Sequence, residues 1–160
     1  MERDTSGPQR RENFAFTAGG TLFIGVTLVA VSNTNVIDWK ALHAQDLAWT
    51  QQQLAAAPPS TRAAVIVAQA APTAAHDDYF KPLKATVAAF ARPVMYLHGD
   101  LHAFYCKKQP AWPPNVVDVQ VDSGEKVAGK PLGVTVTGDP RGPFLLDRQA
   151  LGTVSSATCQ

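Results

Sequence analysis

Two histidines and an aspartate share one short segment, His98-Gly99-Asp100-Leu101-His102. Imidazole and carboxylate groups together suit zinc, iron or manganese. The segment follows the apolar run 94–97, so we expect these side chains where a buried strand meets a loop. We therefore predict His98, Asp100 and His102 as ligands of a divalent metal (Mn, Zn or Fe). The site is expected to be weak or incomplete, because three ligands do not make a catalytic centre.

The spacing of these residues sets a condition on metal binding. In a straight strand all three side chains point to one face, yet the two histidines would lie roughly 13 Å apart. One metal, with bonds of about 2 Å, can join them only if the chain turns at Gly99 or Asp100. Two alternatives stay open. One is a hydrogen-bonded strand end, with Asp100 holding His102 or capping backbone amides. The other is acid–base catalysis without metal by a His102–Asp100 pair.

The elements that position this segment are predicted as follows. Gly19-Gly20 indicates a hairpin between strands 14–16 and 22–31. Asp38 is expected to cap a helix that runs to about Ala57, and a second helix is expected over 78–91. The apolar runs 63–68 and 93–97 are typical of strands buried on both faces.

A strand, a helix and a strand of these lengths predict two parallel strands. The ends of these strands, Gln69-Ala70 and His98-Gly99-Asp100, would then share the sheet edge where α/β proteins bind ligands. The remainder of the chain is rich in short strands, predicted over 103–106, 116–121, 132–136 and 144–146. Residues 117–121 alternate between apolar and polar, so one face of that strand is expected to meet solvent.

Other reactive side chains have simpler explanations. His43 is expected at the surface or boundary of the first helix. His76-Asp77-Asp78 is expected to cap the second helix, although it could supply a ligand. Cys106 and Cys159 are predicted to be free thiols, with a disulfide as the alternative.

Composition excludes several classes of protein. The 160 residues suit one domain, predicted as an α/β domain over 13–148 between a disordered tail, 1–12, and a flexible tail, 149–160. The net charge is +1 without a basic stripe, which argues against nucleic-acid binding. The longest apolar stretch, 21–31, is about half of a membrane span. Residues 1–12 carry no signal-peptide pattern, so a cytoplasmic location is expected.

The order of these features resembles the C-terminal half of calcineurin-like metallophosphoesterases. The resemblance covers about residues 11–147. It begins with Arg11-Glu12-Asn13-Phe14-Ala15-Phe16, the strand Leu22-Phe23-Ile24-Gly25-Val26 and the helix that carries Gln45 and Trp49. Val67-Ala68-Gln69-Ala70-Ala71-Pro72 and Tyr96-Leu97-His98-Gly99-Asp100-Leu101-His102 are similar to the last two motifs of the family. The resemblance implies half of a four-layer α/β sandwich, with a mixed sheet and C-terminal antiparallel strands.

The chain departs from the family pattern in ways that affect activity. Ala70 stands where a histidine ligand is usual, and Asp100 stands where the last motif has its first histidine; His102 matches the second. The upstream Asp-x-His, Gly-Asp-x-x-Asp and Gly-Asn-His motifs, which supply most ligands of the two metals, are absent.

The resemblance therefore implies the C-terminal portion of a metal-dependent phosphoester hydrolase that is inactive alone. It would act on a phosphoester substrate once an N-terminal half completes it. The alternative is a non-catalytic, truncated or degenerate domain that serves packing or partner binding. In both cases an uncovered sheet face or edge favours self-association.

Overall fold

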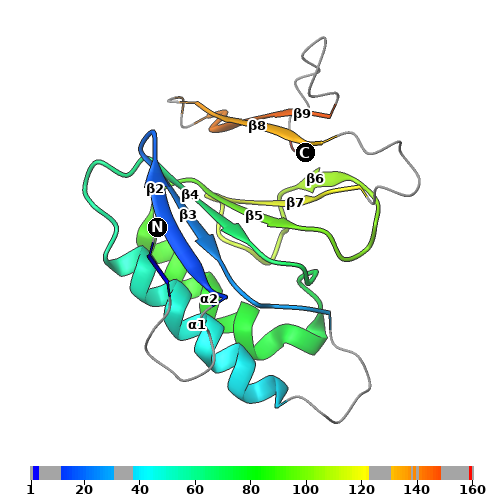
Figure 1. Cartoon of the computed structure of the whole chain (residues 1–160). Coiled ribbons are helices and arrows are strands. Elements are labelled where there is room, and N and C mark those ends of the chain that lie inside the picture. Colours follow the sequence, from blue (N-terminus) through cyan, green and yellow to red (C-terminus); the bar gives the residue numbers. More distant parts are fainter. Residues whose placement is uncertain are drawn as a thin grey trace.

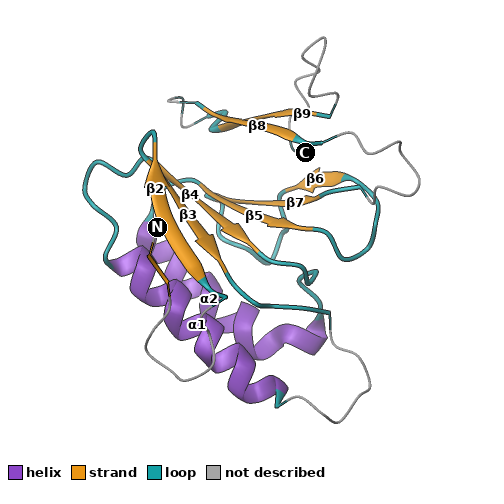
Figure 2. Ribbon diagram, in the orientation of Figure 1, coloured by secondary structure: helices purple, strands orange, loops and turns teal. Residues whose placement is uncertain are grey.

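A mixed β-sheet, with two α-helices on one face and a β-hairpin on the other, makes up the fold (Figures 1 and 2). The structure is a computed structural model, and it describes residues 2–3, 12–30, 38–122, 131–137, 139, 141–148 and 159. The order of strands in the main sheet is β1-β2-β3-β4-β5-β7-β6, and β8 and β9 form a separate antiparallel pair. The predicted α/β class is confirmed at this level.

The first hairpin forms at the predicted glycines. Strand β2 (Phe14–Ala18) pairs antiparallel with β3 (Thr21–Gly25). Gly19 and Gly20 have φ values of 55° and 76°, which side-chain-bearing residues rarely adopt and which a two-residue hairpin turn requires. The strand after this turn ends at Gly25, earlier than predicted. Strand β1 (Glu2–Arg3) pairs with β2, although the sequence predicts a disordered tail there.

Four strands run parallel and form the centre of the sheet. They are β3, β4 (Ala63–Val67), β5 (Val94–His98) and β7 (Val116–Gln120). The crossovers between the first three are the predicted helices, which both cover the same face (Figure 1). The helices are α1 (Trp39–Ala55) and α2 (Asp77–Phe90), and the short 3-10 turn η1 (Ala74–His76) precedes α2. As expected, the Asp38 carboxylate caps α1 by accepting a hydrogen bond from the Ala41 amide at 3.0 Å.

The helix face of the sheet holds the larger core. Side chains that alternate along the strands, such as Ile24, Ile66 and Tyr96, pack against the helices. On the side of α2, buried residues that include Phe80 and Leu83 pack against these strand side chains. This arrangement sets the helix axes antiparallel to the strands, so that both helices begin at the carboxyl edge of the parallel strands.

The opposite face is covered by the hairpin of β8 (Gly133–Val136) and β9 (Phe144–Asp147). Phe144 and Leu146 from this hairpin belong to a second buried cluster with Met95 and Val119 of the sheet. The edge strand β6 (Tyr105–Lys107) pairs antiparallel with β7. These pairings match the predicted C-terminal antiparallel strands.

A disulfide joins Cys106 of β6 to Cys159. The prediction of two free thiols is therefore wrong. Cys106 and Cys159 both pack against the buried cluster between the main sheet and the hairpin. The fold thus brings together two cysteines that lie 53 residues apart in sequence. No helix among the described residues is long and apolar enough to cross a membrane.

Part of the face opposite the helices carries a row of aromatic rings on the first hairpin. Phe16 and Phe23 are cross-strand partners whose ring centroids lie 4.8 Å apart, and Phe14 stacks on Phe16 at 6.2 Å. The β8–β9 hairpin lies over the other end of the sheet (Figure 1). Phe16 remains 37% exposed.

Candidate functional site

The carboxyl edge of the parallel strands brings the two predicted loops together, as expected. The amide of Gly99, directly after β5, donates to the carbonyl of Gln69 after β4 at 3.3 Å. Asp100 completes this contact, because its Oδ2 accepts from the Ala71 amide at 3.2 Å and its Oδ1 accepts from Gln69 Nε2 at 3.3 Å. Both oxygens of the carboxylate therefore hold the neighbouring loop.

This geometry corresponds to the hydrogen-bonded strand end, in which Asp100 caps a backbone amide. His102 lies outside the contact. Its side chain is exposed, and its φ of 60° shows that the chain turns in the left-handed region at His102. Gly99, which was expected to allow the turn, does not have a positive φ.

His98 points into the protein rather than toward the edge. The ring is 2% exposed, and its Nε2 lies 3.0 Å from Asp118 Oδ1 and 3.0 Å from the Tyr105 hydroxyl. Asp118 Oδ2 also accepts from Tyr105 at 3.2 Å and from Gln109 Nε2 at 2.6 Å. His98 Nε2 thus contacts both the carboxylate and the phenol, whereas the other ring nitrogen, Nδ1, is buried without a hydrogen-bond partner in the structure. Burial and the Asp118 charge raise the pKa of Tyr105.

The burial of Asp118 contradicts the expected solvent-facing side of its strand. All five residues of β7 are buried. Gln120, the other polar member, accepts from the Leu101 amide at 3.3 Å and donates to the Ala103 carbonyl. The segment after β5 passes over the end of β7 to reach β6, and Gln120 bonds to it, whereas Asp118 bonds to His98 of β5, Tyr105 of β6 and Gln109 after β6. The alternation of apolar and polar residues correctly indicates that β7 has two chemically different faces. It does not show that other parts of the chain cover the polar face.

The three predicted ligands do not fit a metal ion. His98 is bonded to Asp118, Asp100 holds amides of the neighbouring loop, and His102 is exposed. Among the described residues, no group of three or more histidine, cysteine, aspartate or glutamate side chains is arranged to hold a metal.

A pair of buried histidines lies at the same edge and was missed by the sequence analysis. His43 Nε2 of α1 lies 3.1 Å from His76 Nδ1 at the start of α2, and both residues are 2% exposed. The expectation of a surface or boundary His43 is therefore wrong. His76 is the N-cap residue of α2, but its side chain makes no capping bond. One signal was present, because His43 follows Trp39 by one helical turn and so lies near the predicted apolar face.

Burial lowers the pKa of both rings. Desolvation is the largest cause in each case, and the neighbouring His43 ring lowers the pKa of His76 further. The negative charge of Asp78 raises the pKa of His43 and that of Asp100 raises the pKa of His76, without reversing either shift. The pair is therefore neutral at neutral pH, and one shared proton links the two helix starts.

A second buried polar network ties the same region together. Asn13, just before β2, donates to Asp46 Oδ1 of α1 at 2.9 Å and accepts from the amide and hydroxyl of Thr27. One turn further along α1, Thr50 contacts the Tyr79 hydroxyl of α2 at 3.0 Å. Burial raises the pKa of Tyr79, so this phenol stays protonated. These contacts fix the positions of both helices.

The lowered histidine pKa values predict a pH dependence of stability. An unfolded histidine titrates near 6.5, so the unfolded chain binds more protons than the folded chain below that pH. The free energy of unfolding should be constant above pH 6.5 and fall below it, by at most about 1.4 kcal/mol per pH unit for each excess proton. Chemical denaturation between pH 7.5 and 5 measures the slope.

A matched variant isolates the pair from other groups. In His43→Gln/His76→Asn, two amides replace the facing ring nitrogens without titrating, so the part of the slope that belongs to the pair should disappear. His102→Ala serves as the exposed control and should keep the wild-type slope. An unchanged slope in the double variant would contradict the assignment.

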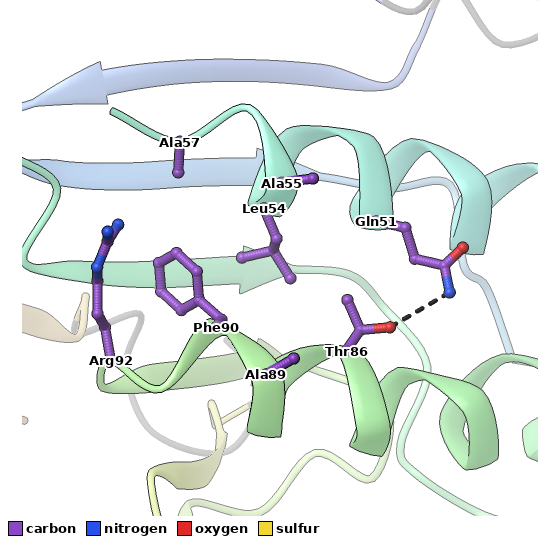
Figure 3. Close-up of a pocket in the computed structure, with 8 residues that line it drawn as sticks. All are labelled: Gln51, Leu54, Ala55, Ala57, Thr86, Ala89, Phe90 and Arg92. Carbon is purple, nitrogen blue, oxygen red and sulfur yellow. Dashed lines mark hydrogen bonds between the residues drawn. The ribbon is translucent and has the colours of Figure 1, made fainter. Parts of the chain in front are cut away.

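The far end of the helix pair presents a different surface. A groove of about 330 Å³ runs between the C-terminal halves of α1 and α2 (Figure 3). Leu54 and Phe90 contribute its apolar lining, and the Gln51–Thr86 hydrogen bond of 3.2 Å spans one end. Arg92 lies over the Phe90 ring at 4.9 Å and donates to the Pro58 carbonyl. This groove lies away from the carboxyl edge and brings no catalytic group together.

Comparison of the chain with protein-family models, curated proteins and solved structures gives no significant match. The assignment of function therefore rests on the geometry of the chain itself.

Proposed function

We propose that this chain is a non-catalytic α/β module that associates with a second copy of itself through the β2–β3 hairpin. The observation that carries the proposal is the aromatic row Phe14, Phe16 and Phe23 on the sheet face opposite the helices. The rings stack on one another, and Phe16 is one of the few large apolar side chains among the described residues that remain exposed. Exposed apolar patches on a sheet are typical of interaction sites.

The strand that carries Phe16 favours pairing with a second copy. Strand β1 pairs with β2 only at Phe14 and Ala15, which leaves the outer edge of residues 16–18 without a described partner strand. Phe16, Thr17 and Ala18 are exposed and uncharged. Natural edge strands usually carry a charge, a proline or a bulge that prevents association. Two antiparallel copies of β2 can pair around a two-fold axis, which is the commonest symmetry of homodimers.

The same architecture supports the proposed relation to metallophosphoesterases. We propose that the chain corresponds to half of such a sandwich, with a helix layer, a sheet and part of a second sheet. The contact between the loops after β4 and β5 favours this relation, because these loops carry the segments similar to the last two motifs. In a two-metal phosphoesterase, bound metal supplies the hydroxide nucleophile. Here both oxygens of Asp100 accept hydrogen bonds from the neighbouring loop, so this carboxylate is not placed to hold a metal. We therefore propose that the chain does not hydrolyse phosphoesters.

Sedimentation equilibrium tests the association directly. The wild-type chain should show a concentration-dependent average mass between monomer and dimer. Phe16→Lys places a charge in the aromatic row and should shift the protein to monomer, because a buried unpaired lysine is strongly unfavourable. Leu145→Lys is the matched control, since Leu145 is similarly exposed at 40% but lies on β9; it should associate like wild type.

A further variant distinguishes the face from the edge. Thr17→Lys alters the exposed β2 strand without removing an aromatic ring, so it should weaken association if the β2 edges pair. A monomer at every concentration of wild-type protein would refute the proposal, as would an equal loss of association in the Leu145 control.

Metal addition tests the proposed absence of catalysis. Manganese or zinc should raise the melting temperature of the chain by no more than about 1–2 °C, since linkage stabilisation requires tight binding to the folded state. An aryl phosphate assay with Mn²⁺ should show no turnover above buffer. An increase of many degrees in the melting temperature that is lost in His102→Ala would show that the chain binds metal at the predicted site, and would contradict the proposal.

A further inference from the structure

A cavity lies between the amino edge of the main sheet and the β8–β9 hairpin, on the side away from the histidines. Its volume is about 300 Å³, at the lower end of the range for small-molecule sites. Pro93, just before β5, and Asn115, just before β7, form one wall. Asn115 Nδ2 donates to the carbonyls of Val87 and Arg92 at 2.9 and 2.8 Å, so this wall is fixed to the end of α2.

The cavity combines an apolar interior with positive charge. Val117 and Phe144 line it, and each is only 7% exposed. Lys108 and Arg141 are its charged residues, and none of the described residues that line it is acidic. Arg141 contacts Asp139 at 3.4 Å, but its side chain is 91% exposed, so this ion pair is weak and the guanidinium can turn to a ligand.

The disulfide fixes a further wall. Cys159 lines the cavity and is held to β6 through Cys106. The cavity is therefore bounded by the main sheet, the hairpin turn and a covalently attached residue of the C-terminal segment.

We propose that this cavity binds a small amphipathic anion, with an aliphatic or aromatic body against Val117 and Phe144 and an acidic head group near Lys108 and Arg141. The head group can be a carboxylate or a sulfonate, because both present anionic oxygens to the two cations. This site is separate from the aromatic row on β2 and β3, and it does not depend on self-association.

Binding of 8-anilinonaphthalene-1-sulfonate, followed by fluorescence, tests the site. The probe should bind the wild-type chain and be displaced by octanoate, whereas 1-octanol at the same concentration should displace it much less. Lys108→Gln and Arg141→Gln should each weaken probe binding by about two- to fivefold, as expected for solvent-exposed charge contacts. Lys40→Gln, an exposed lysine on α1, should leave the affinity unchanged.

A variant that adds a large side chain to the cavity wall gives a stricter test. A Cβ atom built on Gly142, which lines the cavity, meets no atom within 4 Å. Gly142→Leu can therefore fold normally, which near-ultraviolet circular dichroism checks, and should lower probe affinity more than tenfold. Phe16→Lys should retain full binding.

Three results would overturn the proposal. They are equal displacement by octanol and octanoate, unchanged affinity in both Lys108→Gln and Gly142→Leu, and loss of probe binding in Phe16→Lys. The last result would place the probe on the aromatic row instead.

Discussion

Reduction of the Cys106–Cys159 disulfide is expected to lower the free energy of unfolding by about 3–4 kcal/mol. The bond closes a loop over a sequence separation of 53 residues. The chain-entropy account attributes the effect to the unfolded state, which gains conformational freedom when so long a loop opens. Urea denaturation with and without a phosphine reductant measures the loss. Cys106→Ser/Cys159→Ser should reproduce it without a reductant.

The control for this prediction is chemical. The double serine variant should show no further change on addition of the reductant. Two titratable thiols in the denatured, unreduced wild-type chain would contradict the disulfide itself.

Replacement of Asp118 by alanine should destabilise the fold by about 3–5 kcal/mol, because several donors lose their acceptor and each unsatisfied buried donor costs about 1–3 kcal/mol. Asp118 is 1% exposed, and its carboxylate accepts from His98, Tyr105 and Gln109. Removal of the carboxylate leaves these three donors without their acceptor, and the one on His98 is almost fully buried. Chemical denaturation measures the change. Asp139→Ala is the control, because Asp139 is half exposed and should change stability by less than about 1 kcal/mol.

A double-mutant cycle tests whether the network is the cause. Tyr105→Phe removes the hydroxyl that contacts both His98 and Asp118, and should cost about 1 kcal/mol in the wild-type chain. In the Asp118→Ala background the same change should cost much less, because the hydroxyl has already lost its acceptor. Additive effects would show that the two residues act independently and would refute the network.

Local features of the fold could be predicted because their causes are close together in sequence. Gly19-Gly20 forms the two-residue turn of the first hairpin, and the Asp38 side chain caps the helix that begins next to it. The parallel order of β4 and β5 followed from the length of the helix between them. That order places Gln69 beside Asp100, as the sequence analysis expected.

The candidate site was less predictable because its contacts join distant segments. His43 and His76 are 33 residues apart, and His98 and Asp118 are 20 apart. Neither pair forms a local motif. For His98, the sequence identified a side chain able to bind a metal, but the fold turned its ring toward Asp118 and away from Asp100 and His102.

The sequence alone determined the two helices, the first hairpin and the two parallel strands whose loops meet at the carboxyl edge, because turn chemistry and the hydrophobic period act over a few residues. Only the tertiary structure decided which polar groups are removed from water. A buried carboxylate or imidazole must find a hydrogen-bond partner wherever the packed chain supplies one. For Asp118 and His43 that partner comes from another element of the fold.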